Sequence, residues 1–232
     1  MSKKFRSDYF TYETLKPIIG RPDYISLHHL KKQIKANAQS VSSTLGGGNN
    51  GLLGLVLTDA EYAQVSQIAF VREPYPGALV FPNGTTSIQS KMLEDAYRKR
   101  MKNYEACDGV EKALIQQIVK AIHESWLQPL RNNVTDTITG SIPVILTYLF
   151  STFGDVTARS LNRKEDEVKT MSYDPAMDPI DNIFTDVQEL ADFAVAARSP
   201  YSREQMINIA SNIELFTTLK QGFQIIVCFY IY

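Results

Sequence analysis

The sequence predicts an all-α protein with about eight helices in two lobes. Apolar residues recur at helical spacing in eight segments, and alternation typical of strands is nearly absent before the C-terminal tail. No strand and helix pattern alternates along the chain, which excludes the α/β classes. No repeat with a period of about 20 to 50 residues occurs, so a solenoid is disfavoured.

The first two helices are expected on either side of a glycine-rich loop. Residues 24–41 form an amphipathic segment, with apolar positions Ile25, Leu27, Leu30, Ile34 and Ala38. Residues 46–51 are glycine and asparagine, which favour a loop. Thr58 and Glu61 then have the spacing of a capping box, in which each side chain binds an unpaired amide, so a short helix should follow.

Two further helices are expected after a second loop. Residues 70–84 contain three prolines and two glycines, which indicate an extended surface loop. Residues 85–105 read as a helix whose apolar face is Ile88, Met92, Ala96 and Tyr97. Asp108 and Gly109 predict a break, and residues 110–126 form a core helix with Val110, Leu114, Ile118 and Ile122 on one face.

Cap residues predict the last four helices. Ser141 and Pro143 suit a helix start, and Gly154 suits its end. Thr157 is expected to cap the next helix, and Ser202 with Gln205 forms a second capping box. Pro179 starts the helix between them, with an expected inward face of Ile180, Ile183, Phe184, Val187, Leu190, Ala191 and Ala194. The last helix should bury Met206, Ile209, Ala210, Ile213 and Phe216.

The breaks at 154–157 and 172–179 are the candidate hinges between lobes, and the first is favoured. The expected organisation is a flexible segment at 1–20, an N-terminal lobe at 21–155, a C-terminal lobe at 156–222 and an apolar tail at 223–232.

Composition excludes several functional classes. The 232 residues are 44% hydrophobic and 21% charged with a net charge of -1, which is typical of a soluble globular protein. The N-terminus lacks the apolar run of a signal peptide, and the tail is about half the ~20 residues that a membrane helix needs. Two cysteines, Cys107 and Cys228, give no disulfide framework, so a cytoplasmic location is expected.

No catalytic, cofactor-binding or metal-binding residue is predicted. His28, His29 and His123 form no H-E-x-x-H motif, no G-x-S-x-G elbow occurs, and the glycine run lacks the Lys-Ser/Thr of a phosphate loop. The acidic group Asp174, Asp178, Asp181 and Asp186 is explained by the preference of carboxylates for a helix start. Neither an enzyme nor a small-molecule substrate is therefore expected.

One basic cluster is the candidate nucleic-acid site, formed by Lys91, Arg98, Lys99, Arg100 and Lys102. A locally basic helix can contact phosphates even in a neutral chain. Glu94, Asp95 and Glu105 are interleaved with these residues, so a solvated helix face is the favoured interpretation and an RNA site the alternative.

Five motifs occur in an order that resembles Gag polyproteins of copia-type LTR retrotransposons. They are GGGNNGLLGLVLTDAEY, AFVREPYPG, YLFSTFGDVT, DPAMDPIDNIF and ARSPYSREQMINIA, within residues 46–210. The resemblance implies a capsid-like fold of two helical lobes that binds copies of itself and assembles into virus-like particles enclosing the RNA of the element.

Two features depart from that family. No C-x2-C-x4-H-x4-C zinc knuckle is present, which puts specific RNA packaging in doubt, and the apolar tail suggests a truncated or frameshifted copy. Two alternative functions remain: a non-assembling helical interaction module derived from Gag, and an RNA-binding helical protein.

Overall fold

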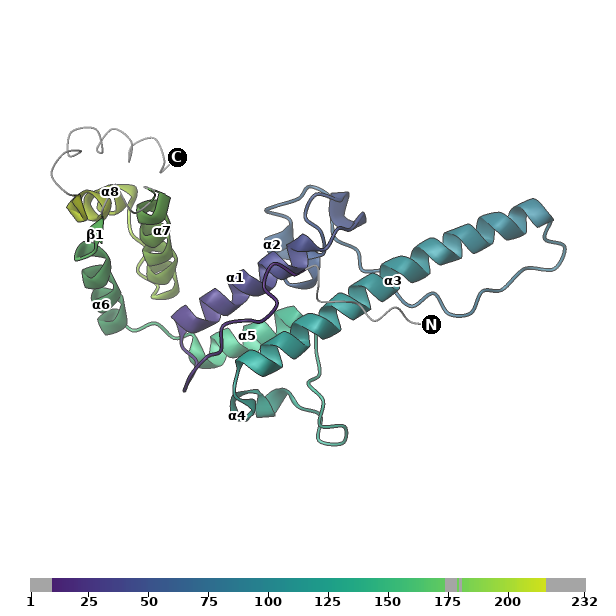
Figure 1. Ribbon diagram of the computed structural model, residues 1–232, viewed down its shortest axis with the longest axis horizontal. Helices are drawn as coiled ribbons and strands as arrows, with labels where there is room; N and C mark the ends of the chain where they lie inside the picture. The colour runs from purple at the N-terminus through teal and green to yellow at the C-terminus, as the bar shows by residue number, and fades with distance from the viewer. Residues whose placement is uncertain (1–9, 174–178, 180, 216–232) are drawn as a thin grey trace. The chain divides into compact units, whose positions relative to one another are not determined.

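The computed structural model describes residues 10–173, 179 and 181–215 (Figure 1). Eight α-helices and one pair of two-residue strands lie in this part of the chain, which confirms the predicted all-α class and the expected number of helices. The described residues form two compact units. Unit 1 contains those up to Pro22 and Ser26–Ser151, and unit 2 contains Asp23–Ile25 and those from Thr152 on. The sequence had placed the boundary between residues 155 and 156.

Unit 1 contains five α-helices and three short 3-10 turns. In chain order they are α1 (Tyr24–Ser40), η2 (Leu45–Gly47), η3 (Leu53–Leu55), α2 (Asp59–Tyr62), α3 (Ser87–Ala121), α4 (Glu124–Leu127), η4 (Gln128–Leu130) and α5 (Ile142–Phe153). The first two residues of α1 and the last two of α5 count with unit 2. The expected capping box of Thr58 and Glu61 is present at the start of α2.

The core of unit 1 comes from one face each of α1, α5 and the second half of α3. Its fully buried side chains include Leu27, Leu30, Ile34, Leu114, Ile118, Ile142, Ile145 and Leu149. Two buried amides link the helices, because Asn37 Nδ2 donates to Gln117 Oε1 at 2.9 Å. Burying these polar groups costs little, since each amide is hydrogen-bonded.

The predicted break at Asp108 and Gly109 is wrong, because α3 runs through both residues for 35 residues. A glycine inside a helix costs about 1 kcal/mol. Cys107 and Val110, on either side of it, are both fully buried, and burying one apolar side chain contributes about 1.5 to 3 kcal/mol. Packing therefore outweighs the local preference. Lys112 Nζ also pairs with Asp108 Oδ2 at 2.8 Å across the glycine.

Part of the N-terminal segment, which the sequence predicts to be flexible, packs on unit 1. In the part that the structure describes, residues 10–20, Phe10 and Leu15 are buried. The Tyr12 amide donates to Asn37 Oδ1 at 2.7 Å, and the Ile18 amide donates to the Ala121 carbonyl at 2.7 Å. These contacts join the segment to α1 and to the end of α3.

The glycine-rich loop after α1 has a packing role. Gly46 has a φ of 57°, and a Cβ there would lie 2.1 Å from the Tyr62 hydroxyl oxygen. That hydroxyl donates to the Gly46 carbonyl at 3.1 Å, which closes the loop over α2. A side chain at this position would therefore be both strained and blocked.

Unit 2 is a small helical unit. It contains α6 (Ala158–Lys169), α7 (Asp181–Ala196), α8 (Arg203–Asn212) and a parallel pair of strands, β1 (Ser172–Tyr173) and β2 (Glu214–Leu215). Thr157 caps α6 and the capping box of Ser202 and Gln205 starts α8, as predicted. Its core includes Leu161, Val168, Ile183, Val187, Leu190, Phe193, Ala194, Met206, Ile209, Ala210 and Ile213.

Some expectations lie outside the described residues. These are the inward positions Ile180 and Phe216, the acidic residues Asp174 and Asp178, Cys228 and the apolar tail 223–232. Within the described part of the chain, no helix has the length and apolar character needed to cross a bilayer.

Candidate functional site: the arm of α3

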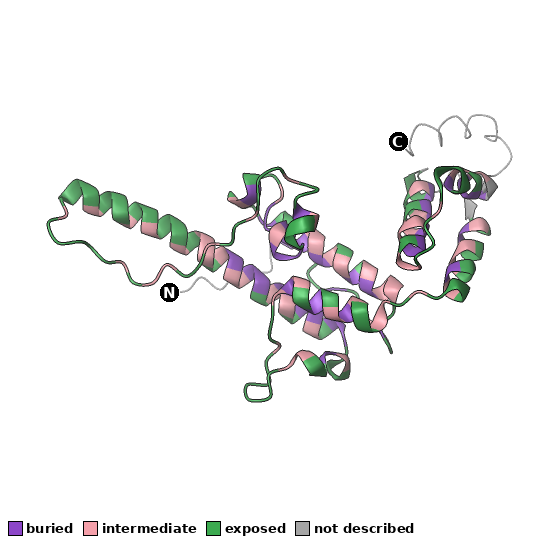
Figure 2. Cartoon of the chain, turned by 180° about the vertical axis from the view of Figure 1, so that it is seen from behind, coloured by how far each residue is buried: buried purple, intermediate pink, exposed green. Residues whose placement is uncertain are grey.

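The first half of α3 is exposed, unlike the second. We call residues 71–105 the arm; it consists of the loop 71–86 and the α3 residues 87–105. In Figure 2 this half of α3 and much of the loop are exposed. Ile88 is 73% exposed and Met92 is 67% exposed, although the sequence had placed them on an apolar helix face. The residues of that face contact no core, so the arm presents apolar side chains to its surroundings.

The loop of the arm runs along α3 and is held to it by side chains. Tyr97 Oη donates to the Gly77 carbonyl at 2.9 Å, and Arg100 Nε donates to Glu73 Oε1 at 2.7 Å. The rings of Tyr75 and Tyr104 meet edge to face, with centroids 5.2 Å apart. The base of the arm is closed by the ion pair of Arg72 and Glu111, at 2.5 Å. These four contacts define the loop face of α3.

Sequence reasoning predicted the loop but missed this docking. The available signal was the spacing of Tyr97 and Tyr104, which are seven residues apart and therefore share a helix face. The loop opposite them contains Tyr75, a matching aromatic residue. Aromatic pairs of this kind stabilise a contact beyond the area they bury.

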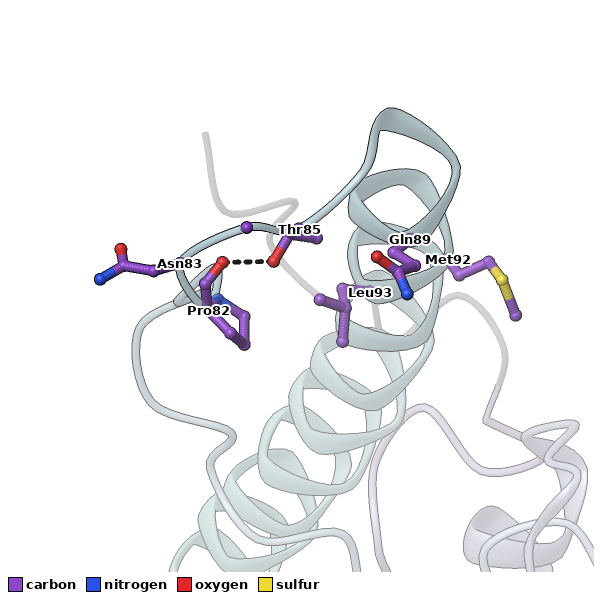
Figure 3. A pocket seen from close by; sticks show the side chains of 7 residues that line it. Pro82, Asn83, Thr85, Gln89, Met92 and Leu93 are labelled. Atoms are coloured by element: carbon purple, nitrogen blue, oxygen red, sulfur yellow. Dashed lines mark hydrogen bonds between the residues drawn. The ribbon is translucent and has the colours of Figure 1, made fainter.

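A shallow pocket lies at the tip of the arm (Figure 3). It has a volume of about 520 Å³ and is lined by Pro82, Asn83, Gly84, Thr85, Gln89, Met92 and Leu93. The Thr85 hydroxyl donates to the Pro82 carbonyl and closes the turn. No charged side chain lines the pocket, so its chemistry suits an apolar side chain rather than a phosphate group.

The structure divides the five predicted basic residues into two arginines that form ion pairs and three lysines that do not pair with the described residues. Arg100 lies on the loop face and is bound to Glu73, so its role is structural. Arg98 lies 3.7 Å from Glu94 and 3.9 Å from Asp95, which partly neutralise it. Lys91, Lys99 and Lys102 are exposed and form no ion pair with the described residues.

Helix geometry places Lys91, Arg98 and Lys102 on the side of α3 away from the loop. At 100° per residue, these three fall within 40° of one another, whereas Arg100 and Leu93 fall on the loop face. We call the row Lys91, Asp95, Arg98 and Lys102 the outer stripe of the arm. It is a predominantly basic row interrupted by one carboxylate.

Other residue types that could carry chemistry have structural roles. Burial raises the pKa of the Cys107 thiol, which makes it a poor nucleophile. His123 caps α4 by accepting from the Ser125 amide at 3.3 Å. Among the described residues, no group of three or more His, Cys, Asp or Glu could hold a metal ion.

Comparisons with known proteins add no relative. No protein-family model matches the chain, and neither a curated protein nor a solved structure shows significant similarity to it.

Proposed function

We propose that this protein is a structural subunit of the Gag capsid type, which assembles with copies of itself into shells that enclose RNA in the cytoplasm. The observation that carries the proposal is the arm. It exposes Val71, Tyr75, Val80, Ile88 and Met92, each more than 60% exposed. Exposed apolar residues that gather on one projecting element are typical of protein contacts. The resemblance of five motifs to copia-type Gag is the reason for assigning this contact to assembly.

The physical properties of the chain suit a shell subunit. Each unit has its own core, so the subunit is folded before assembly. A net charge of -1 leaves little repulsion between copies. A shell repeats the same modest contact many times, so avidity supplies the stability that a single contact lacks. No catalytic step is required.

RNA binding is the second candidate function. It is favoured by the exposed ammonium groups of Lys91, Lys99 and Lys102 on the arm. Binding through lysines to phosphates weakens steeply with salt, because it releases counterions from the nucleic acid. In a shell protein, RNA binding through these lysines accompanies assembly. In a non-assembling module, RNA binding is the function and no shell forms.

The test is assembly of the purified chain. Size-exclusion chromatography with light scattering and negative-stain microscopy would follow particle size across protein concentrations, with nuclease-treated and RNA-supplemented samples. Closed particles are expected as concentration rises. A monomer under every condition would contradict the shell and leave the interaction module, and salt-sensitive RNA binding by that monomer would favour the second candidate.

A further inference from the structure

The outer face of α7 in unit 2 is acidic, and one of its carboxylates, Asp192 Oδ1, accepts from Gln188 Nε2 at 3.1 Å. Within Asp181–Ala196 there are four acidic residues and no basic one. A carboxylate at a helix start is favoured by the helix dipole, which accounts for Asp181. Glu189 and Asp192 lie in the second half of α7, where the dipole gives no such reason. Burial, and then the nearby charge of Glu189, raise the pKa of Asp186, and the charge of Lys164 opposes that shift.

The acidic row of α7 has the same spacing as the outer stripe of the arm. The α7 row is Asp181, Thr185, Gln188 and Asp192, and the arm row is Lys91, Asp95, Arg98 and Lys102. Both rows follow the spacing i, i+4, i+7 and i+11, which keeps four residues on one helix face. The terminal charges are about 16 Å apart in each row, because an α-helix rises 1.5 Å per residue.

Opposite charges therefore coincide at both ends of the two rows. Lys91 and Lys102 meet Asp181 and Asp192 whether the helices align in parallel or antiparallel. The one carboxylate of the arm stripe, Asp95, then falls opposite an uncharged residue, which is Thr185 in the first alignment and Gln188 in the second.

Apolar residues flank both rows. Ile88 is one turn from Lys91 on α3, and Val195 follows Asp192 on α7; they are 73% and 63% exposed. The buried face of α7, with Val187 and Leu190, is turned to its own core, so the acidic row is on the outward side of the helix.

We infer that the outer stripe of the arm binds the acidic row of α7 in a second copy of this chain. The inference rests on the proposed assembly and identifies its contact surfaces. The two surfaces differ, so the contact is head to tail: in a pair, one subunit keeps a free α7 row and the other keeps a free arm. Such a contact propagates from copy to copy into a ring or an open chain, and a shell combines it with further contacts.

The acidic row of α7 in a second copy suits the outer stripe better than RNA does. A nucleic-acid backbone carries a charge at every nucleotide, so a phosphate would lie near Asp95. The row of α7 instead has neutral residues at its two middle positions. An RNA backbone also leaves Ile88 without an apolar partner, whereas Val195 lies level with Ile88 when the two helices align antiparallel.

The experiment is a charge swap between two variants of the full chain. Lys91→Glu with Lys102→Glu reverses the arm, and Asp181→Lys with Asp192→Lys reverses α7. Each variant alone brings like charges together and should weaken self-association, measured by sedimentation velocity, at least about 10-fold. Their equimolar mixture restores both contacts and should associate in a 1:1 ratio, close to the unmodified chain. Lys16→Glu with Lys120→Glu is the control for the arm variant, since it lowers the net charge by the same amount at exposed positions outside the arm.

The outcomes separate the inference from the proposed function. If the unmodified chain assembles and both variants assemble equally well, the contact is wrong and the shell stands. If each variant is impaired and the mixture stays impaired, the pairing of the two surfaces is wrong. If the arm variant alone loses binding to a single-stranded RNA oligonucleotide, measured by fluorescence anisotropy, while its assembly is unchanged, RNA occupies the stripe. A monomeric unmodified chain contradicts both the shell and the contact.

Discussion

The two halves of α3 have similar helical geometry and opposite environments. Leu114 and Ile118 in the second half are fully buried, whereas Ile88 and Met92 in the first half are 73% and 67% exposed. Both pairs have apolar side chains four residues apart. The difference is the partner: α1 and α5 cover the second half, and a loop covers one side of the first. Helical spacing of apolar residues therefore defines a face, but the rest of the fold decides whether that face is buried.

The first half stays helical without a core for local reasons. Thr86 and Gln89 form a capping box at its start. Glu94 pairs with Arg98 at the favourable i, i+4 spacing, and the loop contacts Tyr97, Arg100 and Tyr104. The buried half also supplies a formed helix to extend, which removes the cost of nucleation.

Truncating one apolar side chain in each half gives the largest expected contrast. Leu114→Ala should lower the free energy of unfolding by about 3 kcal/mol, because it removes packing and leaves a cavity. Met92→Ala should change it by less than about 0.5 kcal/mol, because the side chain is mostly in water. Urea denaturation followed by circular dichroism measures both. A similar loss in the two variants would show that the arm packs on the core after all.

Removing a polar contact in each half gives a smaller contrast. Gln117 joins three segments, since it accepts from Asn37 and donates to the carbonyls of Tyr12 and Glu13. Gln117→Met should cost about 1 to 3 kcal/mol, because it leaves buried groups unpaired. Tyr97→Phe removes one half-buried bond in the arm and should cost about 1 kcal/mol or less. Equal losses by urea denaturation would argue against a buried network that anchors the N-terminal segment.

The parts of the fold that depend on local chemistry were predictable. Capping boxes at Thr58 and Ser202 act within four residues, so sequence alone located those helix starts. The face of α7 was also predicted from its spacing, with Ile183, Val187, Leu190 and Ala194 buried. These features require no knowledge of a distant partner.

The remainder depended on contacts between distant segments. Gly109 continues a helix because residues on both sides of it are buried by other helices, which the local sequence does not record. The arm also depends on contacts between segments that are distant in the sequence. The sequence identified the five basic residues but not that Arg100 pairs with Glu73, which is 27 residues away. The sequence also identified the apolar face of Ile88 and Met92 but not its exposure, because exposure depends on which distant segments cover a face.

Lowering the pH should change the free energy of unfolding through the ion pair of Lys31 and Glu61 in the packed region more than through that of Arg98 and Glu94 in the arm. Burial raises the pKa of Glu61, but hydrogen bonds from Lys31 and the Thr58 amide outweigh it and lower the pKa to about 2. Because the ordinary value is near 4.3, this stabilisation is complete above about pH 4.3 and is lost as the pH falls toward 2. Glu61→Gln should flatten that part of the stability profile.

The matched change in the arm is Glu94→Gln. Its pair with Arg98 is longer, at 3.7 Å, and more exposed, so the change should lower the free energy of unfolding by less than about 0.5 kcal/mol. Urea denaturation at stepped pH values measures both variants. If Glu94→Gln has the larger effect, the arm contributes more to stability than its exposure indicates.

The smallest expected effect is local to the arm. Arg100→Ala removes the pair with Glu73 while leaving the core untouched, so global stability should fall by no more than about 1 kcal/mol. Hydrogen exchange should nevertheless accelerate in residues 71–86, because one of the four contacts that hold the loop is lost. Lys99→Ala is the control, since Lys99 forms no ion pair with the described residues. Faster exchange in the Lys99→Ala control as well would mean that helix charge, rather than the Arg100 contact, holds the loop. No acceleration in either variant would mean that the contacts of Tyr97 and Tyr104 are enough to hold the loop on α3.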